Sequence, residues 1–237
     1  TPIFVLLDLE IGMNERLCKP LTWDPNRKMD RGKVMTAADL EAGKLFGRYL
    51  DVDGDGIPYR TYPGTHPTKG SFFTRGTTKD RMARYSEEGP DYVENMERLL
   101  KKFATAKKLV PKPELRQASQ PTKYGVIYYG STSPAMVEAL DELEKRNIHL
   151  NALRIRAFPF GQEVEDFIAA HDRIFVVEQN RDAQLRSLLV NELEIDPARL
   201  VKVLHYDGNP ITARFIIGGI AERLAGATVT PLRKAVP

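Results

Sequence analysis

The chain has 237 residues, of which 42% are hydrophobic and 28% are charged, and its formal net charge is +3 at pH 7. This length allows one large or two modest domains of an ordinary globular protein. The single cysteine, Cys18, excludes a disulfide framework and an iron–sulfur cluster held by four thiolates of this chain. No apolar run approaches the roughly 20 residues of a membrane span. We therefore expect a cytoplasmic protein, in a reducing compartment and without a membrane contact.

The first predicted element is a buried strand at the start of the chain. Residues 3–9 read IFVLLDL, a nearly continuous apolar run of the kind seen in parallel strands that are covered on both faces. Such a strand needs neighbours on both sides, and neither a signal peptide nor a turn precedes it. We therefore expect the chain to be the middle of a larger polypeptide, cut just before a central strand.

Residues 14–118 are expected to be less regular. The sequence predicts a short helix around Ala37–Gly43, an extended piece at SFFTRG, and a basic helix over Asp91–Leu109. The prolines and polar residues that follow this helix are typical of a linker. Because residues 14–90 contain too few apolar side chains to bury themselves, we expect them to lie against another surface.

An acidic loop, RYLDVDGDGIPYRTYPG (48–64), has part of the pattern of a calcium site. Asp51, Asp53 and Asp55 have the spacing of the first, third and fifth ligands of an EF-hand. Position twelve, where the ion needs a bidentate carboxylate, is Tyr62. The loop therefore predicts no calcium site.

The same loop contains Gly54-Asp55-Gly56, which is also the beginning of a thiamine-diphosphate motif. That motif needs an asparagine some two to three dozen residues later and a helix directly after it. The next asparagine, Asn95, lies too far along the chain, and Ile57-Pro58 stops a helix at once. We therefore interpret the loop as a hairpin turn between the extended runs YLDV and IPYRTY.

A basic stretch follows. Residues 60–85 contain six Lys or Arg residues and a single acid, Asp80. Because glycines and aromatic residues lie between these charges, the stretch could face an anion or an acidic partner. A basic surface exposed to solvent is an equally good interpretation. The candidates for contact with a substrate or partner are Arg60, Arg75 and Arg84.

From about residue 122 the pattern alternates between strands and helices of about a dozen residues. This alternation predicts an α/β fold with a mainly parallel sheet sandwiched by helices. Pro134 suits the first turn of a helix and Ser133 its cap. The predicted strands cover 123–129, 150–158, 173–179 and 200–206, and the predicted helices cover 134–146, 161–171, 183–193 and 212–224.

Two strand ends of this half are candidate sites. Gly130, Ser131 and Thr132 follow a parallel strand and precede a helix, where ligands of open α/β sheets bind, although such a turn is as often only a cap. Glu178-Gln179-Asn180, followed by Gln184, leave another buried strand. They could contact a ligand or a neighbouring subunit, or cap the next helix.

Other kinds of site are excluded by pattern. His66, His149, His171 and His205 are scattered without metal-ligand spacing, and no serine lies in a Gly-x-Ser-x-Gly context. No helix-turn-helix, zinc-finger or RNA-binding signature is present, so no nucleic-acid partner is expected. The sequence therefore predicts no metal site and no self-contained active site.

Taken in order, several segments resemble one known family. They are TPIFVLLDLEIGMN, RYLDVDGDGIPYRTYPGTHPTKGSFFTRGTTKDRMARYSE, VIYYGSTSPAMVEAL, IRAFPF, IFVVEQNRDAQL and YDGNPIT. Together they are similar to the C-terminal part of the alpha subunit of 2-oxoacid:ferredoxin oxidoreductases, most nearly the 2-oxoglutarate type. The resemblance implies that residues 1–13 end a thiamine pyrimidine-binding domain, that 14–118 form a connector, and that 119–237 form a transketolase C-terminal-like domain.

The resemblance also implies a reaction. A 2-oxoacid and coenzyme A would give an acyl-CoA and CO₂, with electrons passed to ferredoxin, in a heterotetrameric complex. Thiamine diphosphate with Mg²⁺ would supply the chemistry at the interface with a beta subunit, which would carry the 4Fe–4S cluster. The partners would be the preceding part of the alpha subunit, the beta subunit and ferredoxin.

The catalytic motifs of this family lie upstream of residue 1, so no catalytic residue is transferred to this chain. This part alone is expected to be inactive and to bind none of these cofactors. The alternative hypothesis is a non-catalytic binding or assembly module that uses the same domain.

Overall fold

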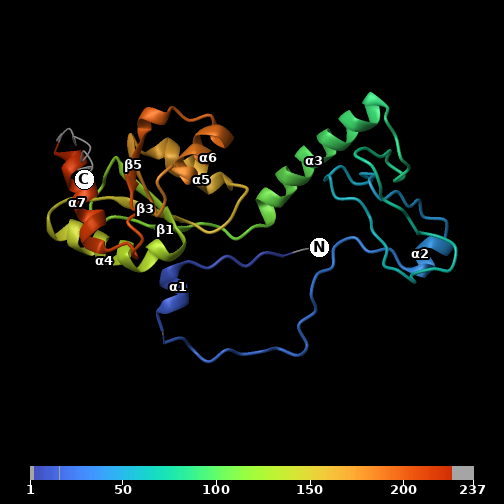
Figure 1. Cartoon of the computed structure of the whole chain (residues 1–237), viewed down its shortest axis with the longest axis horizontal. Helices are drawn as coiled ribbons and strands as arrows, with labels where there is room; N and C mark the ends of the chain where they lie inside the picture. Colours follow the sequence, from blue (N-terminus) through green and yellow to red (C-terminus); the bar gives the residue numbers. More distant parts are fainter. Residues whose placement is uncertain (1–2, 16, 226–237) are drawn as a thin grey trace, which may run out of the picture. The chain divides into compact units, whose positions relative to one another are not determined.

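The computed structural model describes residues 3–15 and 17–225 (Figure 1). The chain forms two compact units. One contains the residues up to Cys18 together with those from Pro111 onward, and the other contains Lys19–Val110. The domain boundaries expected from the sequence, after residues 13 and 118, stay a prediction.

The first unit is built on a five-stranded sheet. Its strands are β1 (Glu114–Arg116), β2 (Tyr124–Tyr129), β3 (Asn151–Ile155), β4 (Arg173–Glu178) and β5 (Leu200–Leu204). Their order across the sheet is β1-β3-β2-β4-β5, with β1 antiparallel to β3 and the other neighbours parallel. The α/β sheet predicted from the repeated strand–helix pattern is therefore confirmed.

Helices cover both faces of this sheet (Figure 1). On one face, α4 (Ser133–Lys145) and α7 (Ala213–Leu224) pack against alternate strand residues such as Val126 and Phe175. On the other face, α5 (Gln162–Ala170) and α6 (Gln184–Leu193) pack against the intervening ones, such as Ile127 and Val176. Because successive strand side chains point to opposite faces, one strand supplies both cores. This two-sided burial explains why the strands read as continuous apolar runs.

Two details of this unit differ from the sequence predictions. Ser133 is the first residue of α4 and not its cap, because a short 3-10 helix, η1 (Gly130–Thr132), precedes it and leads directly into α4. The polar linker predicted after residue 109 contains β1, whose Leu115 pairs with Leu153 of β3. Three residues are too few to show a strand period, so only the pairing with β3 identifies this strand.

The second unit is dominated by one long helix, α3 (Gly89–Leu109), with a short helix, α2 (Ala37–Glu41), and turns. Its buried hydrophobic side chains, among the described residues, are Met35, Leu40 and Ala83. This core is small for a segment of such length, as expected from its sequence. None of the helices in the described part of the chain is long and apolar enough to cross a membrane.

The acidic loop of this unit is not a hairpin. Residues 50–59 form bends and irregular backbone without a strand ladder, and Arg60 pairs with Val34 in an isolated bridge. The loop instead packs on α3, where Thr105 donates to the carbonyl of Asp55 (2.6 Å) and Arg98 donates to that of Gly56 (3.1 Å). The hairpin prediction was wrong because the loop carbonyls bond to α3 side chains and not to a second strand.

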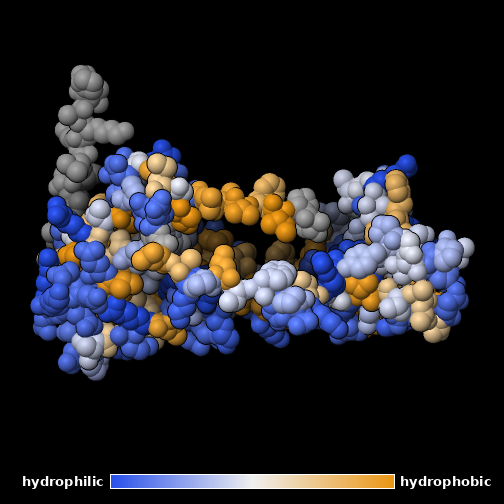
Figure 2. Space-filling view, turned by 90° about the horizontal axis from the view of Figure 1, so that it is seen from below, coloured by the Kyte–Doolittle hydropathy of each residue, from blue (hydrophilic) through white to orange (hydrophobic). Residues whose placement is uncertain are grey.

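The strand predicted over residues 3–9 is also absent. Residues 3–8 form no regular element, and Leu9–Met13 form a short helix, α1. The side chains of residues 3–7 are between 68% and 88% exposed, which leaves a hydrophobic stretch on the surface (Figure 2). A strand needs neighbours that accept its backbone hydrogen bonds, and none of the five described strands pairs with this segment.

Candidate functional site

The candidate site lies where the parallel strands β2 and β4 end. The chain passes from β2 through α4 to β3 on one side, and later enters β4 on the other side of β2. The connections that leave these two strands lead to helices on opposite faces of the sheet. In open α/β sheets such a reversal of strand order leaves a crevice outside the carboxyl ends of the strands, where ligands bind.

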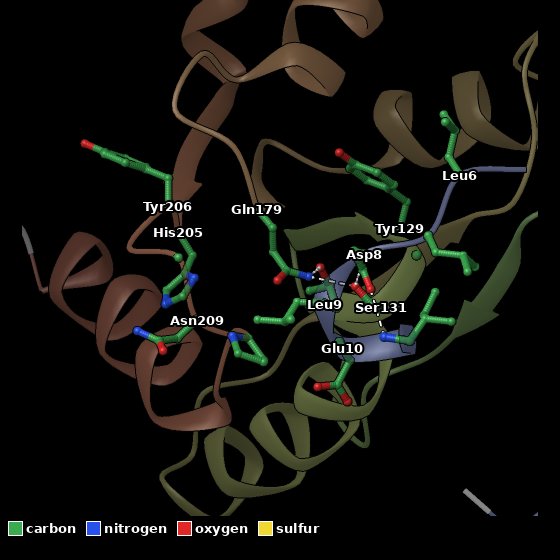
Figure 3. A pocket seen from close by; sticks show the side chains of 16 residues that line it. Leu6, Asp8, Leu9, Glu10, Tyr129, Ser131, Gln179, His205, Tyr206 and Asn209 are labelled. Carbon is green, nitrogen blue, oxygen red and sulfur yellow. Dashed lines mark hydrogen bonds between the residues drawn. The ribbon is translucent and has the colours of Figure 1, made fainter. Parts of the chain in front are cut away.

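A pocket of about 550 Å³ occupies this position (Figure 3). Three groups of residues line it: the turn after β2, the residues after β4 and β5, and the segment before and within α1. Its lining residues are Leu6–Ile11, Tyr129–Thr132, Gln179, His205, Tyr206 and Gly208–Pro210.

A chain of hydrogen bonds crosses the centre of the pocket. Gln179 donates from its amide nitrogen to Ser131 Oγ (3.0 Å) and to Thr132 Oγ1 (3.2 Å), and Ser131 donates to Asp8 (Figure 3). The carboxylate of Asp8 also accepts from the backbone of Ile11 (3.0 Å). These bonds join the ends of β2 and β4 to the N-terminal segment, so the turn after β2 is held by polar contacts.

Glu178 directly precedes the pocket residue Gln179 and caps a helix. It is fully buried, and its carboxylate accepts from the backbone amides of Leu185 (2.7 Å) and Arg186 (3.0 Å) in the first turn of α6. Asn180 donates to the same carboxylate (2.8 Å) and accepts from the backbone of Gln184 (3.1 Å). A buried carboxylate at a helix amino terminus is stabilised by free amides and by the helix dipole. Glu178 and Asn180 therefore hold α6, and the side chain of Gln184 is exposed.

Tyr129 and His205 form other parts of the pocket wall. Burial raises the pKa of Tyr129, and the nearby Glu178 carboxylate raises it further, so the phenol stays neutral at pH 7. His205 is 7% exposed and packs edge-on against Phe215, with ring centroids 4.7 Å apart. A hydrogen bond from the backbone amide of Asn209 lowers the pKa of Asp207, and the electrostatic interaction with His205 lowers this pKa further. The pocket thus offers the phenol of Tyr129, the imidazole of His205 and the carboxylate of Asp8 as hydrogen-bonding groups.

The basic candidates lie in the other unit and differ among themselves. Arg60 is engaged, because it donates to the carbonyl of Arg31 and to Tyr62 Oη (3.2 Å). The side chains of Arg75 and Arg84 are exposed, and neither forms an ion pair with a described residue. Arg75 and Arg84 are therefore the ones available to an external anion.

The acidic loop does not offer free carboxylates to the metal of thiamine diphosphate, and one cysteine does not supply the ligands of an iron–sulfur cluster. Asp53 and Asp55 form ion pairs with Lys33 (2.7 and 2.8 Å), whose ammonium occupies the place that a cation would need. No group of three or more His, Cys, Asp or Glu side chains with metal-binding geometry occurs in the described ranges. Cys18 is exposed and is the sole cysteine, whereas a cluster needs four thiolates.

Several pocket residues were not among the sequence candidates. The strand predicted over residues 3–9 does not point to Asp8 as a site residue. Gln179 is a sequence candidate only within its tripeptide, and no residue of the segment after β5, where His205 and Asn209 lie, is a predicted site residue. The sequence does contain a signal for two of these residues, because Gln179 and His205 each directly follow a predicted parallel strand. Parallel strands place their carboxyl ends at one edge of a sheet, where ligands bind.

Comparison with known proteins adds the family context. No protein-family profile matches the chain. The 2-oxoacid:ferredoxin oxidoreductase 2 subunit alpha of Aeropyrum pernix is 26% identical over 231 residues, which cover 94% of this chain and 34% of that protein. The 2-oxoacid:ferredoxin oxidoreductase subunit alpha of Saccharolobus solfataricus is 24% identical over 228 residues, covering 93% and 34%. The chain is thus similar in sequence to 2-oxoacid:ferredoxin oxidoreductase alpha subunits along nearly its whole length.

A solved structure agrees with this homology at the level of the fold. The 2-oxoglutarate:ferredoxin oxidoreductase from Magnetococcus marinus, which contains 2-oxoglutarate, coenzyme A and succinyl-CoA, superimposes with a TM-score of 0.66 at 18% identity. The match covers 86% of this chain and 32% of that one. The resemblance to 2-oxoacid:ferredoxin oxidoreductase alpha subunits that the sequence predicts is therefore confirmed. The chain spans about a third of the length of the relatives that it matches.

Proposed function

We propose that this chain is the C-terminal part of the alpha subunit of a thiamine-dependent 2-oxoacid:ferredoxin oxidoreductase. The observation that carries the proposal is the similarity to two such subunits along nearly the whole chain, 94% and 93% of its length. The complete complex would convert a 2-oxoacid and coenzyme A into an acyl-CoA and CO₂, and the two electrons released would pass to ferredoxin.

In this proposal the chain supplies a scaffold and surfaces for partners, and the cofactors are held elsewhere. Thiamine diphosphate with Mg²⁺ would be bound by the preceding part of the alpha subunit and the beta subunit, and the 4Fe–4S cluster by the beta subunit. The ion pairs of Lys33 with Asp53 and Asp55 and the single cysteine support this division.

The N-terminal segment would then belong to the preceding domain. The side chains of residues 3–7 are apolar and exposed, which is typical of a strand removed from its sheet. The pocket at the ends of β2 and β4 would lie at the interface with that domain. In a longer polypeptide that includes the upstream residues, the backbone amides of residues 3–7 should become protected from hydrogen exchange.

The substrate would be 2-oxoglutarate. The sequence resembles most nearly the 2-oxoglutarate type, and the solved neighbour of matching fold contains 2-oxoglutarate and succinyl-CoA. Arg75 and Arg84 are available for the carboxylate of a 2-oxoacid, the phosphates of coenzyme A or an acidic ferredoxin, because a guanidinium matches these anions in shape and charge.

The test is a reconstitution. The complete alpha subunit and the beta subunit should together reduce ferredoxin in a reaction that needs 2-oxoglutarate and coenzyme A, and pyruvate should be a poorer substrate. In that complex, Arg75→Ala and Arg84→Ala should each raise one KM by about tenfold at low salt, as expected for a lost charged hydrogen bond. Arg27→Ala, an exposed arginine outside the basic stretch, is the matched control and should leave every KM unchanged.

Other outcomes separate the competing hypotheses. Activity that prefers pyruvate would overturn the substrate but keep the enzyme class. A reconstituted complex without 2-oxoacid-dependent ferredoxin reduction, despite bound thiamine diphosphate and cluster, would favour the non-catalytic assembly module.

A further inference from the structure

His171 is a buried histidine whose hydrogen bonds fix its protonation state. It directly follows α5, is 3% exposed, and packs against Phe167 with ring centroids 4.3 Å apart. Its Nδ1 lies 2.6 Å from the carbonyl oxygen of Phe167. A carbonyl oxygen can only accept, so Nδ1 carries the proton and donates it. In the neutral ring Nε2 is then an acceptor.

Asn151, the first residue of β3, joins this histidine to a distant segment. Its side-chain oxygen accepts from the backbone amide of Ala118 (2.9 Å), and its amide nitrogen lies 2.9 Å from His171 Nε2. The amide nitrogen can only donate, which agrees with an Nε2 that carries no proton. Each group therefore donates to the next, from Ala118 through Asn151 and His171 to Phe167.

This chain of hydrogen bonds has no place for a second proton on His171. A protonated Nε2 would point its N–H at the amide nitrogen of Asn151, so two donors would face each other. If the Asn151 amide turned over, its oxygen would accept from His171, but its nitrogen would then face the amide of Ala118. In either arrangement one hydrogen bond is lost.

The surroundings of the ring do not compensate for a positive charge. The charged side chains on the elements packed around His171 are Lys123, Glu163, Glu165, Asp166, Asp172, Arg173 and Arg199. The guanidinium of Arg199 donates to the backbone carbonyl of His171 itself (2.6 Å). His171 forms no ion pair with any carboxylate of the described residues. A proton on its ring is therefore unfavourable as long as these hydrogen bonds persist.

We infer that Ala118, Asn151 and His171 form a pH-sensitive latch on the segment between β1 and β2. The latch is closed while His171 is neutral and opens when the ring takes up a second proton. Residues 117–123 of this segment line a pocket of about 590 Å³ together with Asn151, so opening of the latch changes the wall of that pocket. This inference does not depend on the proposed function.

The direction and the size of the effect follow from proton linkage. Only the open latch accepts the second proton, so acid favours opening. A histidine in water is half protonated at about pH 6.5, so the closed latch is complete well above this pH and is lost below it. The equilibrium constant for opening should rise about tenfold from about pH 7.5 to about pH 5.5.

Hydrogen exchange at the amide of Ala118, measured by NMR on the full chain and corrected for the intrinsic rate at each pH, reports this constant. The amide of Ser119 is an internal control. It donates to Glu144 (2.9 Å), and this hydrogen bond lowers the pKa of that carboxylate, so the bond should persist over the same pH range. At about pH 7.5 the imidazole nitrogen shifts of His171 should show a proton on Nδ1 and none on Nε2.

The variant Asn151→Asp tests the mechanism. Its carboxylate oxygens can accept from both Ala118 and a protonated Nε2, so the rise in the opening constant should disappear. Asn191→Asp, the same change at an exposed position of α6, should keep the rise. His149→Gln should keep it as well, although it removes the histidine that contacts Ser119.

Four results would overturn the inference. Two come from the unmodified chain and do not require any variant to fold: a proton on Nε2 at the upper pH, and an opening constant of Ala118 that stays the same or rises no more than that of Ser119. The other two come from the variants: a rise that survives in Asn151→Asp, and a rise that His149→Gln removes.

Discussion

Substituting Gly56 by alanine should destabilise the acidic loop far more than the same change at Gly54. Both glycines have a positive φ, +76° and +77°, so an alanine at either position is strained by about 1–2 kcal/mol. Their surroundings differ. A Cβ at Gly54 meets nothing within 4 Å, whereas one at Gly56 meets the backbone nitrogen of Lys102 at 2.3 Å and the carbonyl oxygen of Arg98 at 2.7 Å.

Backbone atoms of a helix cannot rotate away, so Gly56→Ala must push the loop from α3. Such overpacking costs about 1–3 kcal/mol in addition to the strain, which gives a total of about 2–5 kcal/mol. Moving the loop also breaks the hydrogen bonds from Arg98 and Thr105. Gly54→Ala, with strain alone, is the matched control.

Hydrogen exchange over residues 89–109 is the suitable assay, because it reports the local stability of α3 even when the two units unfold separately. The free energy of opening in α3 should fall by at least about 1 kcal/mol more for Gly56→Ala than for Gly54→Ala. Equal losses in the two variants would show that the loop does not pack on α3 in this way.

Three further predictions concern buried or paired carboxylates. Glu178→Ala should destabilise the first unit by about 3 kcal/mol, since it leaves two buried amides of α6 without an acceptor, while Gln184→Ala should be nearly neutral in the same urea titration. The hydrogen bond from Lys33 lowers the pKa of Asp55. This ion pair contributes less than about 1 kcal/mol to the free energy of unfolding. The contribution is complete above the ordinary carboxyl pKa of about 3.9 and is lost as the pH falls through the pKa of Asp55 in the folded protein. Lys33→Met should therefore make the free energy of unfolding fall less steeply between about pH 4 and pH 2. The control variant Lys28→Met should show the same decline as the unmodified chain. Calorimetric titration with Ca²⁺ should show no binding tighter than about 1 mM, because Lys33 neutralises Asp53 and Asp55, and sub-micromolar affinity that Asp55→Ala removes would contradict this.

The sequence alone determined the elements of the sheet domain. Runs such as RIFVVE and the 3.6-residue spacing of Met136, Leu140 and Leu143 identify buried strands and amphipathic helices, because each element has to bury a continuous face. The helix α3 and the family resemblance also follow from the sequence. These are local signals, or signals carried by the order of motifs.

Only the tertiary structure decided which of these elements have partners. Residues 3–9 have the composition of a strand, yet a strand exists only where neighbours take its hydrogen bonds. Asp55 has the spacing of a calcium ligand, but Lys33, 22 residues away, makes it part of an ion pair. Likewise Gln179 meets Ser131, 48 residues away, because the strand order reverses between β2 and β4. Contacts between distant parts of the chain depend on topology, and no local pattern of residues encodes them.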